Sequence, residues 1–186
     1  MRCNMKTTTL FRFLLVSRVL LAGLALSGVA APGLYAASFI VNTTADTHDK
    51  NFATKEFDGV CDDGTRDPNR PEKIPCSLRA AIEEASNLAA PYPVVTLPSG
   101  TYGLTNGALT ITGNPRTVFL EGAGSNSTII DGGGKPYPDD SSGSQVFEIS
   151  MPGGTVHIYG VTIQNGQTGG LGGGILINSG SALRFV

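Results

Sequence analysis

The second half of the chain is a series of short β-type runs separated by turn residues, and this pattern constrains the fold more than any other feature. After Pro91, apolar residues recur with a period of two in runs of three to five residues. The runs are 94–97, 108–111, 117–120, 127–130, 146–149, 155–159, 161–163, 174–177 and 182–185. Gly and Asn stand between them, and no helical pattern interrupts them. The sequence therefore predicts an all-β region over residues 91–186.

A weak internal repeat runs through these segments. The stretch that begins at Val146 is echoed at Gly174, 28 residues later, and residues 117–131 resemble residues 155–166. Short recurring strands with Gly and Asn at the corners are typical of a parallel β-solenoid, in which each turn stacks on the next. An antiparallel sandwich is the competing interpretation, although it usually has longer strands and hairpin signals. We expect a parallel β-helix.

Residues 1–37 have the pattern of a secretory signal peptide. Residues 19–31 form an apolar run, and small residues follow at 36–38. The run is shorter than the ~20 residues that a bilayer requires, which makes a transmembrane anchor the weaker alternative. The charged residues before it are all basic: Arg2, Lys6, Arg12 and Arg18. We predict a secreted protein, extracellular or on the outer-membrane surface, with no transmembrane segment in the mature chain.

The mature chain is acidic and has the length of one domain. Removal of residues 1–37 leaves all 15 acidic residues against 9 of the 13 basic ones. Such a surface repels nucleic acid and anionic membranes. We therefore expect no nucleic-acid partner, and a single domain at this length.

Cys61 and Cys76 are the two cysteines left once Cys3 departs with the signal peptide. In an oxidising compartment an even pair is expected to form a disulfide. A crosslink that closes a loop of about 15 residues stabilises the fold by roughly 3 kcal/mol in the chain-entropy model. A metal pair or a reactive thiol is the alternative, but no Cys/His cluster accompanies the pair.

One helical pattern lies between Pro75 and Asn87. Ser77 can serve as its N-cap, and Asn87 as its C-terminal stop. Its apolar stripe, at helical spacing, consists of Leu78, Ala81, Ile82 and Ala85.

The polar residues of the same helix are expected to face solvent. Glu83 and Glu84 fall on its polar side, and Arg79 is spaced to pair with Glu83 at i, i+4. The first coil of a β-helix exposes unpaired strand edges and an open apolar end. We predict that residues 38–90 form an N-terminal cap, in which the disulfide loop holds this helix over that end.

Several segments around the helix match those of a known family. They are CSLRAAIEEA at 76–85, FIVNTTAD at 39–46 and DGVCD at 58–62, followed by VTLPSGTY at 95–102 and GGGI at 172–175. Together they resemble the CSLREA-type N-terminal segment of bacterial secreted right-handed β-helix proteins, with repeats like those of polymorphic outer-membrane proteins. The chain departs from the pattern at Ala80, where Glu is usual, and at Ser86. The resemblance implies a right-handed parallel β-helix, a short N-terminal capping α-helix, export and an adhesin-like setting; the family has no single activity.

We therefore expect a secreted or cell-surface β-helix module with a non-enzymatic adhesion or surface-structural role. Host-cell or matrix glycans or proteins are the expected partners. Val186 lies in a strand-like run, so further β-helix turns are expected after it.

The alternative is a polysaccharide lyase or glycoside hydrolase of the pectinase-like β-helix class, incomplete in this chain. Paired carboxylates perform glycoside cleavage, and a basic side chain performs elimination. Arg116 or Lys135 can supply the base. The candidate carboxylates are Glu121, Asp131, Asp139, Asp140 and Glu148.

Acidic residues also crowd the loop beside Cys61. Asp58, Asp62 and Asp63 are candidate calcium ligands, because Ca²⁺ prefers carboxylate oxygens. Their spacing does not match an EF-hand, and a solvated acidic loop is the alternative. No other cofactor is expected.

Overall fold

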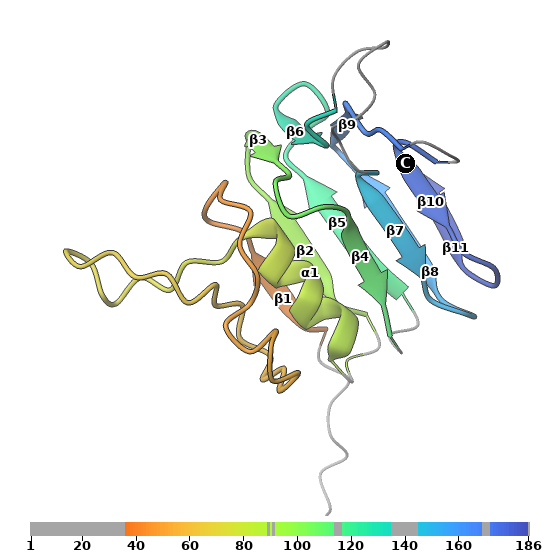
Figure 1. Cartoon of the computed structure of the whole chain (residues 1–186). Coiled ribbons are helices and arrows are strands. Elements are labelled where there is room, and N and C mark those ends of the chain that lie inside the picture. The colour runs from red at the N-terminus through yellow and green to blue at the C-terminus, as the bar shows by residue number, and fades with distance from the viewer. Residues whose placement is uncertain are drawn as a thin grey trace, which may run out of the picture. The chain divides into compact units, whose positions relative to one another are not determined.

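The regular secondary structure of the described residues consists of three parallel β-sheets and one helix (Figure 1). The computed structural model describes residues 36–88, 90, 92–113, 117–134, 145–168 and 172–185. These residues all belong to one compact unit, Leu34–Val186. Apart from its last two residues, the predicted signal peptide at 1–37 lies outside the described residues.

From the second strand onward, every third strand of the chain belongs to the same sheet, and the first strand of the chain joins the first sheet. The first sheet has the order β1 (Ser38–Ile40), β2 (Val94–Leu97), β5 (Thr117–Gly122), β8 (Thr155–Tyr159) and β11 (Ala182–Phe185). The second has the order β3 (Gly100–Gly103), β6 (Thr128–Asp131) and β9 (Thr162–Gln164). The third has the order β10 (Ile175–Ile177), β7 (Phe147–Ser150) and β4 (Leu109–Thr112).

Consecutive strands from β2 onward pass through the three sheets in turn, and each pairs with its counterpart three strands later. Every strand pairing that the structure describes is parallel. Thr117 pairs with Thr155, and Phe147 with Ile175, so the two halves of each predicted sequence repeat are neighbours in register. The parallel all-β class is confirmed, and the antiparallel sandwich is excluded for the described strands.

All nine predicted strands are present, with ends that differ by at most two residues from the prediction. β1 and β3 were not predicted. β1 has only three residues, and β3 has Gly at both ends, which in the sequence is a turn signal. Their strand conformation comes from pairing, because β2 and β6 lie beside them.

From β1 to β8, alternate residues of each strand face a continuous apolar core between the sheets. Because partners in a parallel register face the same side, apolar residues of successive strands form columns. Two such columns in the first sheet are Val95–Leu120–Ile158 and Val118–Val156–Leu183. This stacking accounts for the predominance of aliphatic residues at the inward positions.

The helix, α1 (Leu78–Asn87), lies beside the first strands of this arrangement, β1, β2 and β4 (Figure 1). Ser77 is its N-cap, and its Oγ accepts a hydrogen bond of 3.0 Å from the Ala80 N–H. The residues of the predicted apolar stripe, Leu78, Ala81, Ile82 and Ala85, are all buried in the shared core.

The prediction for the polar face of α1 was wrong. Glu83 is only 9% exposed and Glu84 is 0% exposed, and Arg79 pairs with Asp46 instead of Glu83. The physical reason is that the segment between β1 and α1 lies over the side of the helix that was expected to face solvent. His48 and Gly59 of that segment contact the two glutamates.

Candidate functional site

An irregular loop, residues 46–63, covers the outer face of α1 and is held there by backbone and side-chain hydrogen bonds. Glu83 Oε2 accepts from the Asp49 N–H at 2.8 Å, and Glu84 Oε2 accepts from the Gly59 N–H at 2.8 Å. On the other side of α1 lies β4, the edge strand of its sheet among the described residues. The loop, α1 and β4 therefore enclose a space on three sides.

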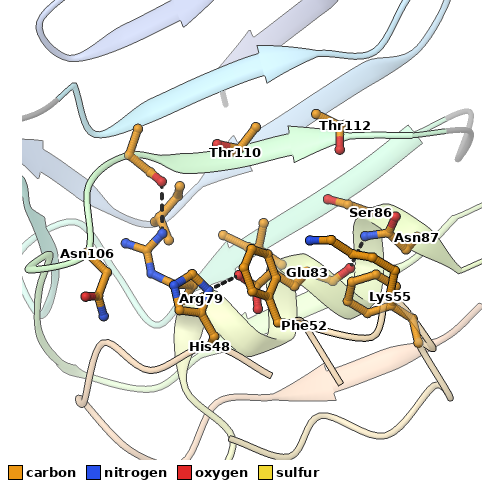
Figure 2. Close-up of a pocket in the computed structure, with 14 residues that line it drawn as sticks. His48, Phe52, Lys55, Arg79, Glu83, Ser86, Asn87, Asn106, Thr110 and Thr112 are labelled. Carbon is orange, nitrogen blue, oxygen red and sulfur yellow. Dashed lines mark hydrogen bonds and ion pairs between the residues drawn. The ribbon is translucent and has the colours of Figure 1, made fainter. Parts of the chain in front are cut away.

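That space is a pocket of about 500 Å³ (Figure 2). The loop contributes His48, Phe52, Lys55 and Phe57; α1 contributes Arg79, Ile82, Glu83, Ser86 and Asn87; and the segment leading into and through β4 contributes Asn106, Ala108, Leu109, Thr110 and Thr112. Its size falls in the range of about 300–1,000 Å³ that is usual for small-molecule sites. The size of this pocket and its mixed polar and apolar lining make it the candidate site.

Arg79 and Asp46 form a buried ion pair at one end of the pocket. Arg79 Nε lies 2.6 Å from Asp46 Oδ1, and the two side chains are 5% and 4% exposed. The guanidinium also donates to the carbonyls of Gly107 at 2.7 Å and Ala108 at 2.9 Å. The pair therefore ties the loop, the helix and the start of β4 together.

The pKa of Asp46 is held below its ordinary value. Burial by itself would raise it, but the hydrogen bond from Arg79 and those from the backbone N–H groups of Thr105 and Asn106 outweigh that effect. The two backbone groups lie 2.6 and 2.7 Å from Asp46 Oδ2. Asp46 is consequently a fixed anion that is neutralised within the protein.

Glu83 and His48 form a second pair, which leads to an aromatic stack. His48 Nδ1 lies 2.5 Å from Glu83 Oε1, and the His48 ring stacks on Phe52 with centroids 4.2 Å apart. Lys55 Nζ lies 3.5 Å from the centroid of the Phe52 ring, so Phe52 lies between His48 and Lys55 (Figure 2). A cation over an aromatic face is attracted by the ring quadrupole.

The remaining polar groups of the pocket have unused hydrogen-bonding capacity. Ser86 is 2% exposed, and its Oγ has no hydrogen-bond partner among the described residues. The hydroxyls of Thr110 and Thr112 likewise make no hydrogen bond within the described part of the chain. The pocket therefore offers these hydroxyls as hydrogen-bonding groups to a ligand.

Sequence reasoning missed this pocket, because its residues come from three segments far apart in the chain. His48 and Glu83 are 35 residues apart, and Asp46 and Asn106 are 60 apart. The signal that the sequence offered was Ser86, a small polar residue directly after the apolar stripe of the helix.

The predicted calcium ligands lie in one loop but have other partners. Both oxygens of Asp62 accept from Arg66 at 2.6 Å, and one also from Lys50 at 3.1 Å. Asp63 accepts from the hydroxyls of Thr47 and Thr65, and Asp58 accepts from the Asn51 amide and the Val60 N–H. The described residues contain no group of three or more His, Cys, Asp or Glu arranged to hold a metal ion. Calcium binding stays a prediction.

The Arg66 contact determines the charge state of Asp62. Its hydrogen bonds hold the pKa of Asp62 well below the ordinary value, against the opposing effect of burial and with further help from the Gly64 N–H and Lys50. Asp62 is therefore an anion already balanced by two cations at neutral pH.

Cys61 and Cys76 form a disulfide, with their Cα atoms 5.2 Å apart. Cys76 directly precedes the helix N-cap Ser77, so the bond fastens the acidic loop to the start of α1. A backbone hydrogen bond of 3.0 Å from Asp63 N–H to Pro75 O lies beside it.

Three of the carboxylates that were candidates for glycoside cleavage are described by the structure, and they lie in three different sheets. Glu121 is in β5, Asp131 in β6 and Glu148 in β7. Each accepts a hydrogen bond from a side chain that follows 30 to 38 residues later, at the next turn of the chain: Tyr159 for Glu121, Gln164 and Asn165 for Asp131, and Asn178 for Glu148. Asp139, Asp140, Arg116 and Lys135 lie outside the described residues.

The described structure thus belongs to the class of mainly parallel β-proteins with one short helix. Comparison of the chain with protein-family models, with curated proteins and with solved structures finds no match. Within the residues that the structure describes, no helix has the length and apolarity needed to cross a membrane.

Proposed function

We propose that the chain is a right-handed parallel β-helix of the CSLREA-type family, closed at its N-terminal end by α1 and the disulfide loop. This proposal is supported by the strand order, because consecutive strands belong to three different sheets in turn and each strand pairs in parallel with the strand three positions along the chain. Parallel crossover connections are right-handed in about 98% of cases. α1 packs on β1, β2 and β4, the strands that begin the stack, and so covers the end at which strand edges invite aggregation.

The function that we propose is a non-enzymatic adhesion or surface-structural role, outside the cell or on its surface. The observation that supports this role is that Glu121, Asp131 and Glu148 each accept a hydrogen bond from a side chain of the next turn. Catalysis of glycoside cleavage needs two carboxylates that flank one bond, about 5–9.5 Å apart. These three lie in separate sheets and are engaged by neighbouring side chains, which suits stacking of the turns.

Export is supported by the apolar segment near the N-terminus and by the disulfide. Disulfides persist in oxidising compartments and are rare in the cytosol. In the proposed setting, glycans or proteins of a host cell or its matrix are the partners, and the long sheet faces supply the surface.

The experiment compares turnover with binding. The mature chain, exported to an oxidising periplasm and purified, is incubated with a panel of uronate polymers while ultraviolet absorbance reports unsaturated products. In parallel, its binding to cultured cells and to immobilised matrix glycans is measured. Saturable binding without turnover supports the proposal.

Turnover that Asp131→Ala abolishes would instead establish the pectinase-like alternative. The matched control is Asp67→Ala, because Asp67 is an acidic residue outside the sheets, in the segment between β1 and α1. Loss of turnover in both variants would point to instability, which a thermal melt of each variant detects.

A further inference from the structure

We propose that the pocket between the 46–63 loop, α1 and β4 binds an uncharged, hydroxyl-rich sugar residue, such as the terminal hexose of a neutral glycan. This inference rests on the proposed function, since it gives the adhesion module a defined binding site on its N-terminal cap. It is argued from the charges, the free hydroxyls and the space in the pocket.

Two of the charged groups that line the pocket, Arg79 and Glu83, already have side-chain partners. Arg79 is paired with Asp46, and Glu83 with His48. Lys55, the remaining cation of the lining, lies over the Phe52 ring. An anionic ligand group that bound Arg79 would have to displace the buried Asp46 carboxylate from these contacts, and breaking a buried pair is strongly unfavourable. A neutral ligand leaves them intact.

The unused hydrogen-bonding side chains of the pocket are neutral hydroxyls. Ser86 Oγ is buried without a partner, which is a costly arrangement that a ligand hydroxyl relieves. Thr110 and Thr112 add two hydroxyls along β4. Each hydroxyl can both donate and accept, which matches the groups that a sugar ring presents at successive carbons.

The backbone of β4 adds to this set. The Leu109 N–H donates to Val146 O at 2.9 Å, so the polar backbone groups of Leu109 face β7. Alternate residues of a strand direct these groups to opposite sides, and those of Thr110 and Thr112 therefore turn away from β7. They face the side on which α1 and the pocket lie.

The apolar part of the lining suits the C–H groups of a sugar. Ile82 and Phe57 lie in the wall, and the volume of about 500 Å³ accommodates a monosaccharide or a short oligosaccharide end. An extended peptide fits less well, because it would need the strand position beside β4 and α1 packs directly against that strand. The observations therefore favour a sugar over a peptide.

The test measures binding of the intact mature chain to an immobilised panel of neutral oligosaccharides with different terminal hexoses, alongside sialylated and sulfated counterparts. Positive members are then titrated by calorimetry as free sugars, up to about 10 mM, the range of weak affinities. We expect saturable binding to at least one neutral sugar and no preference for the anionic counterparts.

Two variants locate the site. Ser86→Ala and Thr110→Val should each weaken the affinity about tenfold, while Thr101→Val, an exposed threonine of β3 away from the pocket, leaves it unchanged. Ser86→Ala should not lower the melting temperature, because it removes a buried hydroxyl that has no partner.

The inference is overturned if no neutral sugar binds, if only anionic sugars or extended peptides bind, or if the two variants bind as the wild type does. Binding to cells or matrix that persists in Ser86→Ala and Thr110→Val overturns this site and leaves the proposed function standing. Turnover of a uronate polymer, by contrast, overturns the proposed function itself.

Discussion

Arg79 of α1 and Asp46, 33 residues earlier in the chain, form a two-point ion pair with nitrogen–oxygen distances of 2.6 and 3.1 Å. Arg79 also donates hydrogen bonds to the carbonyls of Gly107 and Ala108. Asp46 accepts hydrogen bonds from the backbone N–H groups of Thr105 and Asn106. One buried contact thus joins the 46–63 loop, the helix and the segment that leads into β4.

Replacement of Arg79 by Ala should lower the free energy of unfolding by about 3–5 kcal/mol, because it leaves the Asp46 carboxylate buried without its cation. Urea unfolding followed by circular dichroism measures the change. Arg70→Ala is the control, since Arg70 pairs with Asp67 at an exposed position, and we expect no measurable change there. Equal effects of the two substitutions would contradict the role assigned to the buried pair.

The Cys61–Cys76 disulfide should stabilise the fold by constraining the unfolded chain. Cys61→Ser should lower the free energy of unfolding by roughly 3 kcal/mol for a loop of this length. The effect is expected only under oxidising conditions, so melting temperatures are compared with and without a reductant. The double substitution Cys61→Ser/Cys76→Ser is the control that removes the free thiol. A wild-type melt unchanged by reduction would refute the prediction.

Glu84 is 0% exposed, and its Oε1 has no hydrogen-bond partner among the described residues. Burial raises its pKa to about 7, against the opposing effect of the Gly59 N–H and with added repulsion from Asp49 and Asp58. A carboxyl whose pKa is higher in the folded than in the unfolded state binds a proton on folding. Its contribution to stability is present at acid pH and is lost as the pH rises through 7.

The Glu84→Gln variant has no ionisable side chain at this position, so its stability should not fall in this way as the pH rises. The stability of the variant relative to the wild type should increase by roughly 2–3 kcal/mol between pH 5 and pH 8. Urea unfolding at a series of pH values measures it. Glu56→Gln, an exposed glutamate of the same loop, is the matched control and should follow the wild-type profile. Parallel profiles for all three proteins would show that Glu84 is not protonated near neutrality.

Gly122 at the end of β5 lies against Gly160, which follows β8 on the next turn. A Cβ at Gly122 would lie 2.1 Å from Gly160 O and 2.5 Å from a methyl of Val161. Gly122→Ala should therefore force the two turns apart and cost about 1–3 kcal/mol, the usual penalty of overpacking.

The control for Gly122 is Gly103→Ala at the end of β3, where an added Cβ meets nothing within 4 Å. Thermal melts of the two variants should differ clearly, with the loss confined to Gly122→Ala. A similar melting temperature for both would mean that the turns can separate without cost.

Local patterns and the internal repeat of the sequence were sufficient for nine of the described strands, the helix and the parallel stacking, but not for β1 and β3. A strand with one buried face must alternate apolar and polar residues, and a helix with one buried stripe must repeat them at 3.6 residues. These rules located nine strands to within two residues and the stripe from Leu78 to Ala85. The even cysteine pair likewise pointed to the bond between Cys61 and Cys76.

The environment of the polar residues was decided only by the tertiary structure. Glu83 and Glu84 are on the side of α1 that periodicity assigns to solvent, and they are buried because the 46–63 loop lies over them. Arg79 reaches Asp46 instead of its neighbour on the helix for the same reason. Hydrophobic periodicity records which face meets the core, whereas the partner of a charged side chain depends on segments 30 to 60 residues away that folding brings into contact.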